Sequence, residues 1–162
     1  MTATRTYDYD DRPFDPAAVR ALSGLDYMRG ILHGDFPGAP IAATLGFTLS
    51  EVDLGRATFT GTPDRFAYNP NGTVHGGYAA TLLDSAMGCA VHTTLPAGKA
   101  YSTVDLSISL VRAITERTGA LRSEGKVIHT GSSIITAEGR IVGGDGKLYA
   151  HGTTTCLVLS PR

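Results

Sequence analysis

The chain has 162 residues, 42% of them hydrophobic, and a formal net charge of −1 at pH 7, which is typical of one soluble globular domain. No block of like charge occurs, which argues against a nucleic-acid-binding surface and against a polybasic membrane anchor. No apolar run is long enough for a secretory signal or a bilayer span, so we expect a cytoplasmic protein with neither nucleic acid nor membrane as a partner.

Regular elements follow a short N-terminal arm. The helices are recognised by apolar residues at helical spacing, and the strands by apolar–polar alternation. In chain order we predict a flexible arm over 1–14, a helix over 15–34, strands near 47–52 and 56–62, a long helix over roughly 75–94, and strands over 100–111, 118–129, 132–142 and 147–159. Asp15 and Pro16 begin the first helix, since Asp is a common cap and Pro is common at the first helical position.

The last four strands are expected to form a meander. Residues 143–146, Gly-Gly-Asp-Gly, are a strong hairpin signal, and because they lie between strands they are no dinucleotide-binding motif. Alternation over 100–111 predicts one face with Val104, Leu106, Ile108 and Leu110 and another with Thr103, Asp105, Ser107 and Ser109. Strands around one apolar helix indicate an α+β protein, in which an antiparallel sheet covers that helix within one domain over 15–162.

Asp84 is the only charged residue between positions 66 and 98. Gly77, Thr81, Asp84 and Gly88 lie at i, i+4, i+7 and i+11, so they form one stripe of small residues around a single carboxylate. A polar residue on a solvated helix edge is the ordinary interpretation of such an acid. An isolated acid on an otherwise uncharged helix instead favours a functional role.

The same helix begins with His75-Gly76-Gly77, which are poor helix formers. Glycines here allow either tight packing or the approach of a ligand oxygen to the unpaired N–H groups of a helix start. Gly76 and Asp84 are separated by ~12 Å along one helix, whereas groups that act on one carbonyl must lie within ~3–4 Å of it. If both are catalytic, Gly76 of one subunit works with Asp84 of another. The sequence then predicts an obligate homodimer with active sites at its interface.

Neither a metal nor a cofactor is expected. The two cysteines, Cys89 and Cys156, form no CxxC pair and are interpreted as buried reduced thiols, which suits a cytosolic protein. The five histidines show no zinc-ligand spacing.

Residues 69–84, Asn-Pro-Asn-Gly-Thr-Val-His-Gly-Gly-Tyr-Ala-Ala-Thr-Leu-Leu-Asp, resemble the signature of the hotdog-fold thioesterases of the PaaI-like, phenylacetic-acid-degradation group. Segments 38–47, 101–106 and 146–155 are also similar in order and spacing. The resemblance implies a hotdog fold, in which a curved antiparallel six-stranded sheet wraps around one long central helix, here with an additional N-terminal helix. It further implies an acyl-CoA thioesterase whose homodimers commonly pair into homotetramers.

The resemblance also implies catalytic roles. Asp84 would be the base or the nucleophile at the thioester carbon, and the Gly76 N–H, helped by His75, would polarise the thioester oxygen. Asn69 would position the water or the thioester, and Thr103 would help to orient the water. Whether the carboxylate attacks directly or activates water stays open.

For coenzyme A, the resemblance implies contacts along 110–115 and around 129–133. The candidate contacts are Gly77, Arg112, Thr115, His129, Gly131, Ser132 and Ser133. This chain has Ala113 where many relatives have Pro and Ser132 where many have Arg, which removes a candidate phosphate contact. For Arg112 and His129, ordinary surface positions at strand ends are an equal alternative.

Two other functions on the same fold stay open. The first is a non-catalytic acyl-CoA-binding or regulatory protein, because a fold does not fix a function. The second is an acyl-thioester hydratase or dehydratase, because residues 33–40 superficially resemble a His-Phe-Pro-Gly segment of such enzymes. That segment precedes the first predicted strand, so we interpret it as a loop. Aromatic and medium-chain acyl groups both fit an apolar pocket near 41–47.

Overall fold

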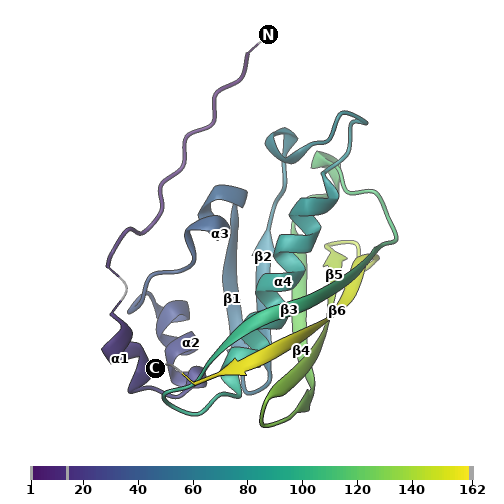
Figure 1. Ribbon diagram of the computed structural model, residues 1–162. Helices are drawn as coiled ribbons and strands as arrows, with labels where there is room; N and C mark the ends of the chain where they lie inside the picture. Colours follow the sequence, from purple (N-terminus) through teal and green to yellow (C-terminus); the bar gives the residue numbers. More distant parts are fainter. Residues whose placement is uncertain (1, 14, 161–162) are drawn as a thin grey trace.

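A computed structural model describes residues 2–13 and 15–160 of the chain (Figure 1). Its helices are α1 (Pro16–Arg20), α2 (Gly24–His33), α3 (Pro40–Leu45) and α4 (Gly76–Thr93), with 3-10 helices η1 (Arg65–Ala67) and η2 (Glu116–Thr118). Its strands are β1 (Phe47–Asp53), β2 (Arg56–Gly61), β3 (Ala100–Leu110), β4 (Leu121–Thr130), β5 (Ile134–Gly143) and β6 (Leu148–Leu159).

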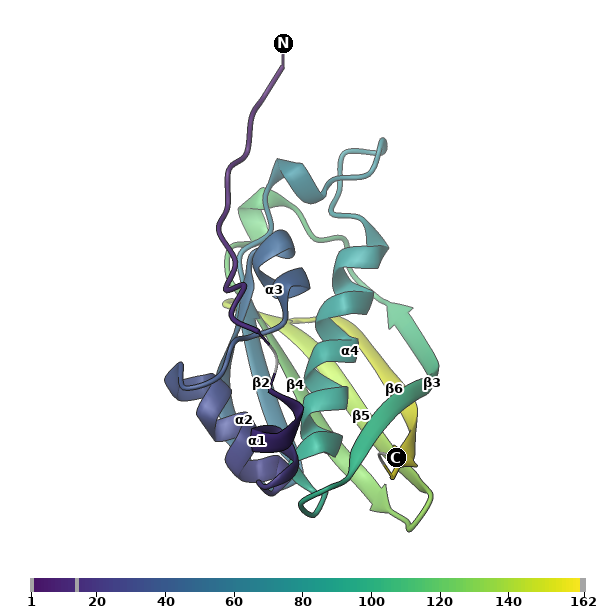
Figure 2. The ribbon, with the colours of Figure 1, turned by 60° about the vertical axis from the view of Figure 1, so that its left-hand side comes forward.

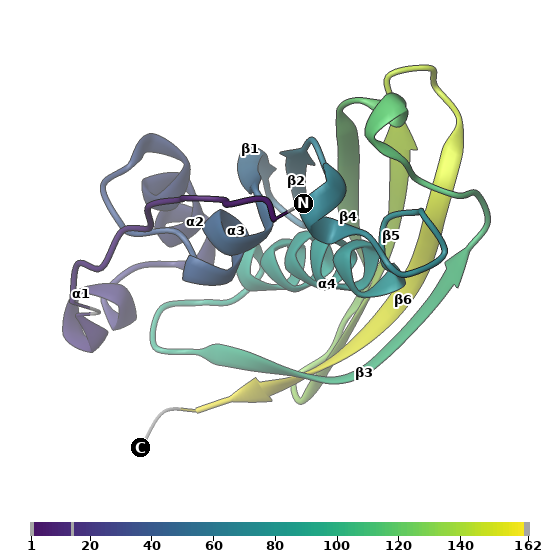
Figure 3. The ribbon, with the colours of Figure 1, turned by 90° about the horizontal axis from the view of Figure 1, so that it is seen from above.

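The strands form one antiparallel sheet in the order β1-β2-β4-β5-β6-β3, and the sheet curves around α4 (Figure 3). One side of α4 is fully buried against it through Leu82, Leu83, Ala86 and Met87, each 0% exposed. Burying a side chain the size of Leu or Met stabilises the fold by about 1.5–3 kcal/mol. This is the predicted α+β hotdog architecture, with helical segments added at the N-terminus.

Glycines allow the sheet to lie directly on the helix backbone. Gly125 of β4 and Gly139 of β5 are register partners. A side-chain Cβ on Gly125 would overlap the carbonyl group of Ala86, and one on Gly139 would lie 2.8 Å from Cγ of Met87. Larger residues at these two positions would therefore push α4 away from the centre of the sheet.

The first predicted helix is two helices. Ser23 interrupts it in an extended conformation, and its hydroxyl accepts a hydrogen bond from the N–H of Asp26 at 3.1 Å, which caps α2. A Ser side chain that satisfies a free N–H in this way favours a new helix start over a continued helix. The apolar segment that follows, predicted as a turn, is the short helix α3. In Figure 2 the three helices lie on one side of α4, and of these α2 and α3 contact β1.

The predicted arm has no helix or strand in its described part, residues 2–13, while residues 1 and 14 lie outside the described residues. Two arginines attach it to the domain. Arg5 donates to the carbonyl of Thr44 at 2.6 Å near the end of α3, and Arg12 donates to the carbonyl of Gly34 at 3.1 Å after α2. Both guanidinium groups therefore lie at helix C-termini, where a positive charge is favourable. The flexibility of the arm stays a prediction.

The predicted four-strand meander is wrong at its first strand. β4, β5 and β6 form a meander, and the hairpin at 143–146 is confirmed, but β3 pairs with β6 at the edge of the sheet, from Ala100 opposite Leu159 to Leu110 opposite Ala150. β4 pairs instead with β2. No tight turn joins β3 to β4, and the segment between them, which includes η2, is long enough to cross from one edge toward the middle.

A bulge in β3 changes which of its residues face the helix. The register shifts between Thr103 and Asp105, and Val104 is 58% exposed. Thr103 before the bulge and Leu110 after it both face α4, so the strict alternation predicted for this strand is wrong. An extra residue in a strand reverses the side on which later side chains lie, and such bulges are common next to active sites.

Candidate active site

Asp84 and Thr103 come from separate segments and meet between α4 and β3. The Thr103 hydroxyl donates to Oδ1 of Asp84 at 3.1 Å, and both side chains are half-buried. Among the residues that the structure describes, no Lys, Arg or His forms an ion pair with Asp84. Its carboxylate thus keeps oxygen lone pairs for a water or a substrate carbon, as base or nucleophile chemistry requires.

The two thiols near this carboxylate are poor nucleophiles. Burial and the charge of Asp84 raise the pKa of Cys89 to about 12. Burial also raises the pKa of Cys156 above its ordinary value. Because the thiolate is the reactive form, both cysteines are inert thiols at neutral pH. Asp84 is therefore the better candidate for the reacting group.

The start of α4 leaves one N–H group free. His75 is the N-cap, and its Nδ1 accepts a hydrogen bond from the N–H of Gly77 at 2.8 Å. The N–H of Tyr78 donates to the His75 carbonyl at 3.0 Å. Within the described residues, the Gly76 N–H has no acceptor. Gly76 therefore offers a donor at the positive end of an 18-residue helix, while the N–H of Gly77, a predicted substrate contact, is already engaged.

A hollow of about 280 Å³ lies beside this helix start. Asn69, His75, Gly76 and Arg112, all predicted site residues, line it together with apolar neighbours such as Leu110. The Asn69 amide is used inside its own loop, where it donates to the Thr73 hydroxyl at 2.9 Å and accepts from the N–H of Asn71 at 2.9 Å. Asn69 thus fixes the loop that leads into α4.

The predicted coenzyme A contacts fall into two groups at opposite ends of the sheet. Arg112 and Thr115 follow the end of β3, near the start of α4. The other group, His129, Gly131, Ser132 and Ser133, lies in the β4–β5 hairpin, at the end where β3 begins and β6 finishes. Strands of this length separate the two groups by about 30 Å. One chain alone does not bring them together.

Arg112 and Thr115 also have structural contacts. Nε of Arg112 donates to the carbonyl of Leu148 at 3.4 Å, and its guanidinium lies 5.8 Å from the centre of the Tyr149 ring. The N–H of Thr115 donates to the Thr118 hydroxyl at 3.0 Å, which closes the turn of η2.

Sequence analysis missed Tyr101, which lies near Asp84. Its ring contacts α4 at Gly88, where an added Cβ would be 2.6 Å from the Tyr101 hydroxyl oxygen. Gly88 follows Asp84 by one helical turn. The small-residue stripe did signal that something approaches the helix there, but only the pairing of β3 with the rest of the sheet identifies Tyr101.

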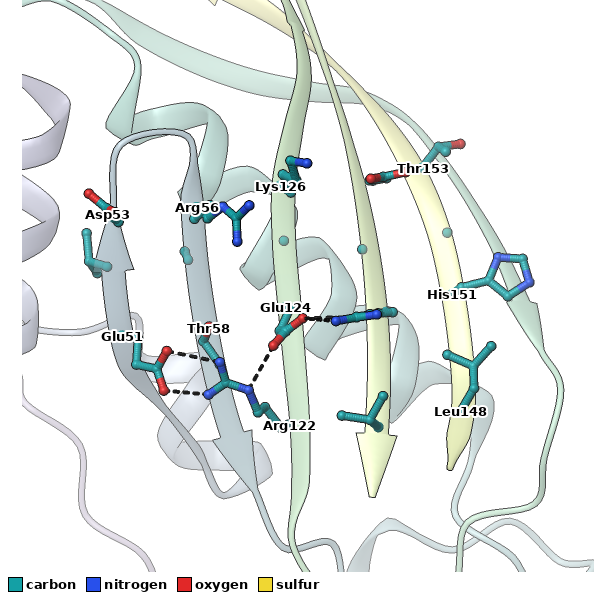
Figure 4. A pocket seen from close by; sticks show the side chains of 18 of the residues that line it. Glu51, Asp53, Arg56, Thr58, Arg122, Glu124, Lys126, Leu148, His151 and Thr153 are labelled. Atoms are coloured by element: carbon teal, nitrogen blue, oxygen red, sulfur yellow. Dashed lines mark hydrogen bonds and ion pairs between the residues drawn. The ribbon is translucent and has the colours of Figure 1, made fainter. Parts of the chain in front are cut away.

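A second hollow, of about 1160 Å³, lies on the other face of the sheet from α4 (Figure 4). Its charges largely neutralise one another. Arg122 bridges Glu51 and Glu124, and Glu124 also pairs with Arg140 at 2.8 Å, which holds the pKa of the Glu124 carboxyl below its ordinary value. None of the predicted site residues lines this hollow, so its size does not make it the reaction site.

Within residues 2–13 and 15–160, no group of three or more His, Cys, Asp or Glu side chains is arranged to hold a metal ion. In the same part of the chain, no helix combines the length and the apolar character needed to cross a bilayer.

Comparison with known proteins identifies the family. Residues 71–150 match the family model described as the thioesterase superfamily. A solved protein of Ralstonia eutropha JMP134, a provisionally named thioesterase related to phenylacetic acid degradation, is 31% identical over 81% of this chain and 98% of its own, with a TM-score of 0.74. The chain belongs to the thioesterase superfamily, in its PaaI-like hotdog-fold group.

Two further proteins are similar to this chain, one in fold and one over part of the sequence. The PaaI protein of the E. coli phenylacetic acid degradation operon has the same fold, with a TM-score of 0.74 at 22% identity over 85% of this chain and 96% of its own. A curated Halobacterium salinarum protein with a provisional esterase name is 41% identical over 73 residues. That match covers 44% of this chain and 46% of the relative, so it spans about half the length of the relative.

Proposed function

We propose that this protein hydrolyses an acyl-coenzyme A thioester to a free acid and coenzyme A. Asp84 is the base or the nucleophile, and the Gly76 N–H of the neighbouring subunit binds the oxyanion. The observation that carries the proposal is the geometry of α4. Among residues 2–13 and 15–160, the Asp84 carboxylate, held by Thr103, has no ion-pair partner and lies two turns from a helix-terminal N–H that has no acceptor. Membership of the thioesterase superfamily supports the same reaction class.

Two routes fit this pair of groups. As a base, Asp84 takes a proton from water as the water oxygen attacks the thioester carbon. As a nucleophile, it attacks that carbon itself and forms a mixed anhydride, which water then hydrolyses. In both routes the negative charge on the thioester oxygen is stabilised by the Gly76 N–H, and the sulfur leaves with its carbon–sulfur electron pair and is protonated to the thiol. The Thr103 hydroxyl orients the carboxylate in either case.

The exposed edge of β3 supports a dimer. Its apolar residues Val104, Leu106 and Leu110 are 58, 36 and 53% exposed, and the strand carries unpaired N–H and C=O groups along that edge. Long apolar edge strands are templates for pairing with a second chain. Antiparallel pairing of two β3 strands about a two-fold axis would bring the start of one α4 toward Asp84 of the other subunit. Further pairing into homotetramers stays a prediction.

The hydratase alternative has no support from the structure. Residues 33–40 end α2 and form the loop before α3, and none of them lines the hollow beside the start of α4.

The test is thiol release from butyryl-, hexanoyl-, phenylacetyl- and lauroyl-coenzyme A. We expect wild type to hydrolyse at least one of them, and Asp84→Asn to lose at least ~100-fold in kcat/KM, as removal of a general base or nucleophile does. Asp35→Asn makes the same chemical change at an exposed position in the loop after α2, away from β3, so it should keep wild-type activity. Binding without thiol release by wild type would replace this proposal with the binding-protein function. Full activity of Asp84→Asn would disprove the mechanism.

A further inference from the structure

The Tyr101 side chain packs against α4 close to Asp84. It lies on β3 two residues before Thr103, ahead of the bulge, so both side chains face the helix. The ring lies over Gly88, where a Cβ atom would be only 2.6 Å from the Tyr101 hydroxyl oxygen and 3.1 Å from its Cε2 atom. Gly88 is four residues after Asp84, which corresponds to about 6 Å along the helix axis.

Other aromatic rings hold Tyr101 in this place. Its ring centre is 5.5 Å from that of His92, which in turn lies 5.2 Å from Tyr27 of α2, and Tyr27 is 5.2 Å from Phe36. These four rings form a row that runs from β3 across the end of α4 to the loop after α2. Aromatic contacts of this kind add to the apolar burial and fix ring orientation.

The phenol has an apolar environment and stays neutral. Burial, helped by the charge of Asp84, raises the pKa of Tyr101 well above its ordinary value. Among the described residues the hydroxyl has no hydrogen-bond partner. Tyr101 therefore presents an aromatic surface, and not a charge, to whatever lies beside Asp84.

A side chain of β3 also lies close to α4 on the other side of Asp84. At the start of the helix a Cβ atom on Gly76 would lie 2.7 Å from Cδ1 of Leu110. Leu110 and Tyr101, both on β3, therefore contact α4 on either side of the turn that carries Asp84.

We propose that Tyr101 closes the acyl pocket one helical turn beyond Asp84 and restricts the enzyme to compact acyl groups. This inference rests on the proposed function and adds its substrate class. An acyl group that extends from Asp84 toward Gly88 would meet the Tyr101 ring within about 6 Å, the axial distance between the two residues, which is about the length of a five-carbon chain or a single ring. A lauroyl chain would have to displace the Tyr101 ring and break its contact with His92.

The test compares wild type with Tyr101→Ala and Tyr101→Phe. Binding of the non-hydrolysable thioethers S-butyl- and S-dodecyl-coenzyme A is measured by calorimetry, and hydrolysis of butyryl- and lauroyl-coenzyme A is measured in parallel. We expect wild type to favour the short ligand. Tyr101→Ala should shift the ratio of affinities toward the long ligand by at least about tenfold, since a single methylene in an apolar pocket can be worth that much. Tyr101→Phe keeps the ring and should keep the wild-type ratio.

The ratio of the affinities for the two thioethers separates a change in specificity from damage to the fold, because a partly unfolded sample lowers both affinities equally. If Tyr101→Ala does not fold, Tyr101→Val keeps a strand-favouring residue and still removes the ring. Equal affinity of wild type for both thioethers, no binding of either, or an unchanged ratio in both small variants would overturn the inference. Selective binding without hydrolysis would leave it standing and disprove the proposed function instead.

Discussion

The first turn of α4 and its middle turn differ in what they are made of. At the first turn, Gly76 offers a backbone N–H whose position follows from the helix itself. At the middle turn, Asp84 offers a side chain whose orientation depends on Thr103 of a strand distant in sequence. The position of the Gly76 N–H is therefore insensitive to most side-chain changes, whereas the orientation of the Asp84 carboxylate depends on how β3 is placed. Substitutions at each turn test the two groups separately.

The largest effect at the first turn is expected from Gly76→Pro. Proline is favourable at the first helical position and removes the N–H there, and His75 already has the extended conformation that a following proline requires. Removal of one oxyanion donor typically costs about 10²–10³-fold in kcat. Gly76→Ala is the matched control, because its Cβ meets Leu110 in the same way but its N–H remains. Equal losses in the two variants would mean that crowding, and not the donor, is responsible.

Mixing subunits tests whether the two turns act across an interface. Co-expression of Asp84→Asn with Gly76→Pro should restore about a quarter of wild-type activity, since half of randomly formed dimers are mixed and each contains one intact site. Steady-state hydrolysis of the purified mixture measures this directly. If both groups of a site come from the same subunit, no mixture will regain activity.

A smaller effect is expected at the middle turn from Thr103→Val. The change keeps the shape of the side chain and removes the hydroxyl that donates to Asp84. A hydrogen bond to a charged group contributes about 1.5–3 kcal/mol, so kcat should fall by about 10- to 100-fold. Thr103→Ser keeps the donor and should retain most of the activity. A loss in Thr103→Ser as large as in Thr103→Val would assign the effect to packing.

The smallest effect is expected on the free energy of unfolding and concerns His92, near the C-terminal end of α4. Burial lowers the pKa of His92 below its ordinary value of 6.5, so the unfolded chain binds a proton there at a higher pH than the folded chain does. The free energy of unfolding should therefore decrease as the pH falls below about 6.5, until the lowered pKa of the folded state is passed.

Urea unfolding at about pH 7.5 and about pH 5 measures this loss, and His92→Phe is the control. The phenyl ring keeps the contacts with Tyr27 and Tyr101 but does not titrate. The variant should lose less stability than wild type between the two pH values. Identical losses would mean that other groups carry the pH dependence.

Features that depend on neighbouring residues were predictable from the sequence. The long helix, the hairpin at 143–146 and the isolation of Asp84 are all local patterns. Features that depend on distant pairing were not. The bulge at Val104 and the pairing of β3 with β6 follow from how six strands fit around a helix. Neither feature is indicated by a turn motif in the local sequence. Tyr101 escaped notice for the same reason, because its importance comes from Gly88, which lies on another element.

The N-terminal helices illustrate a different limit. Apolar spacing over 15–34 is regular enough for one helix, but the Ser23 hydroxyl accepts a hydrogen bond from the N–H of Asp26 and begins a second one. An N-cap side chain stabilises a helix start by about 1 kcal/mol. A free-energy difference of this size cannot be judged from apolar spacing.

The paired glycines of β4 and β5 bear on how this fold can diversify. On their side, α4 lies against bare sheet backbone, so its position is fixed by main-chain contacts that substitutions at Gly125 and Gly139 would break. On the opposite side, β3 meets the helix only through side chains such as Tyr101 and Leu110. Substitutions there can reshape the space beside Asp84 while the helix stays in place. The glycines that let α4 lie against the sheet and the side chains that border Asp84 thus lie on different strands.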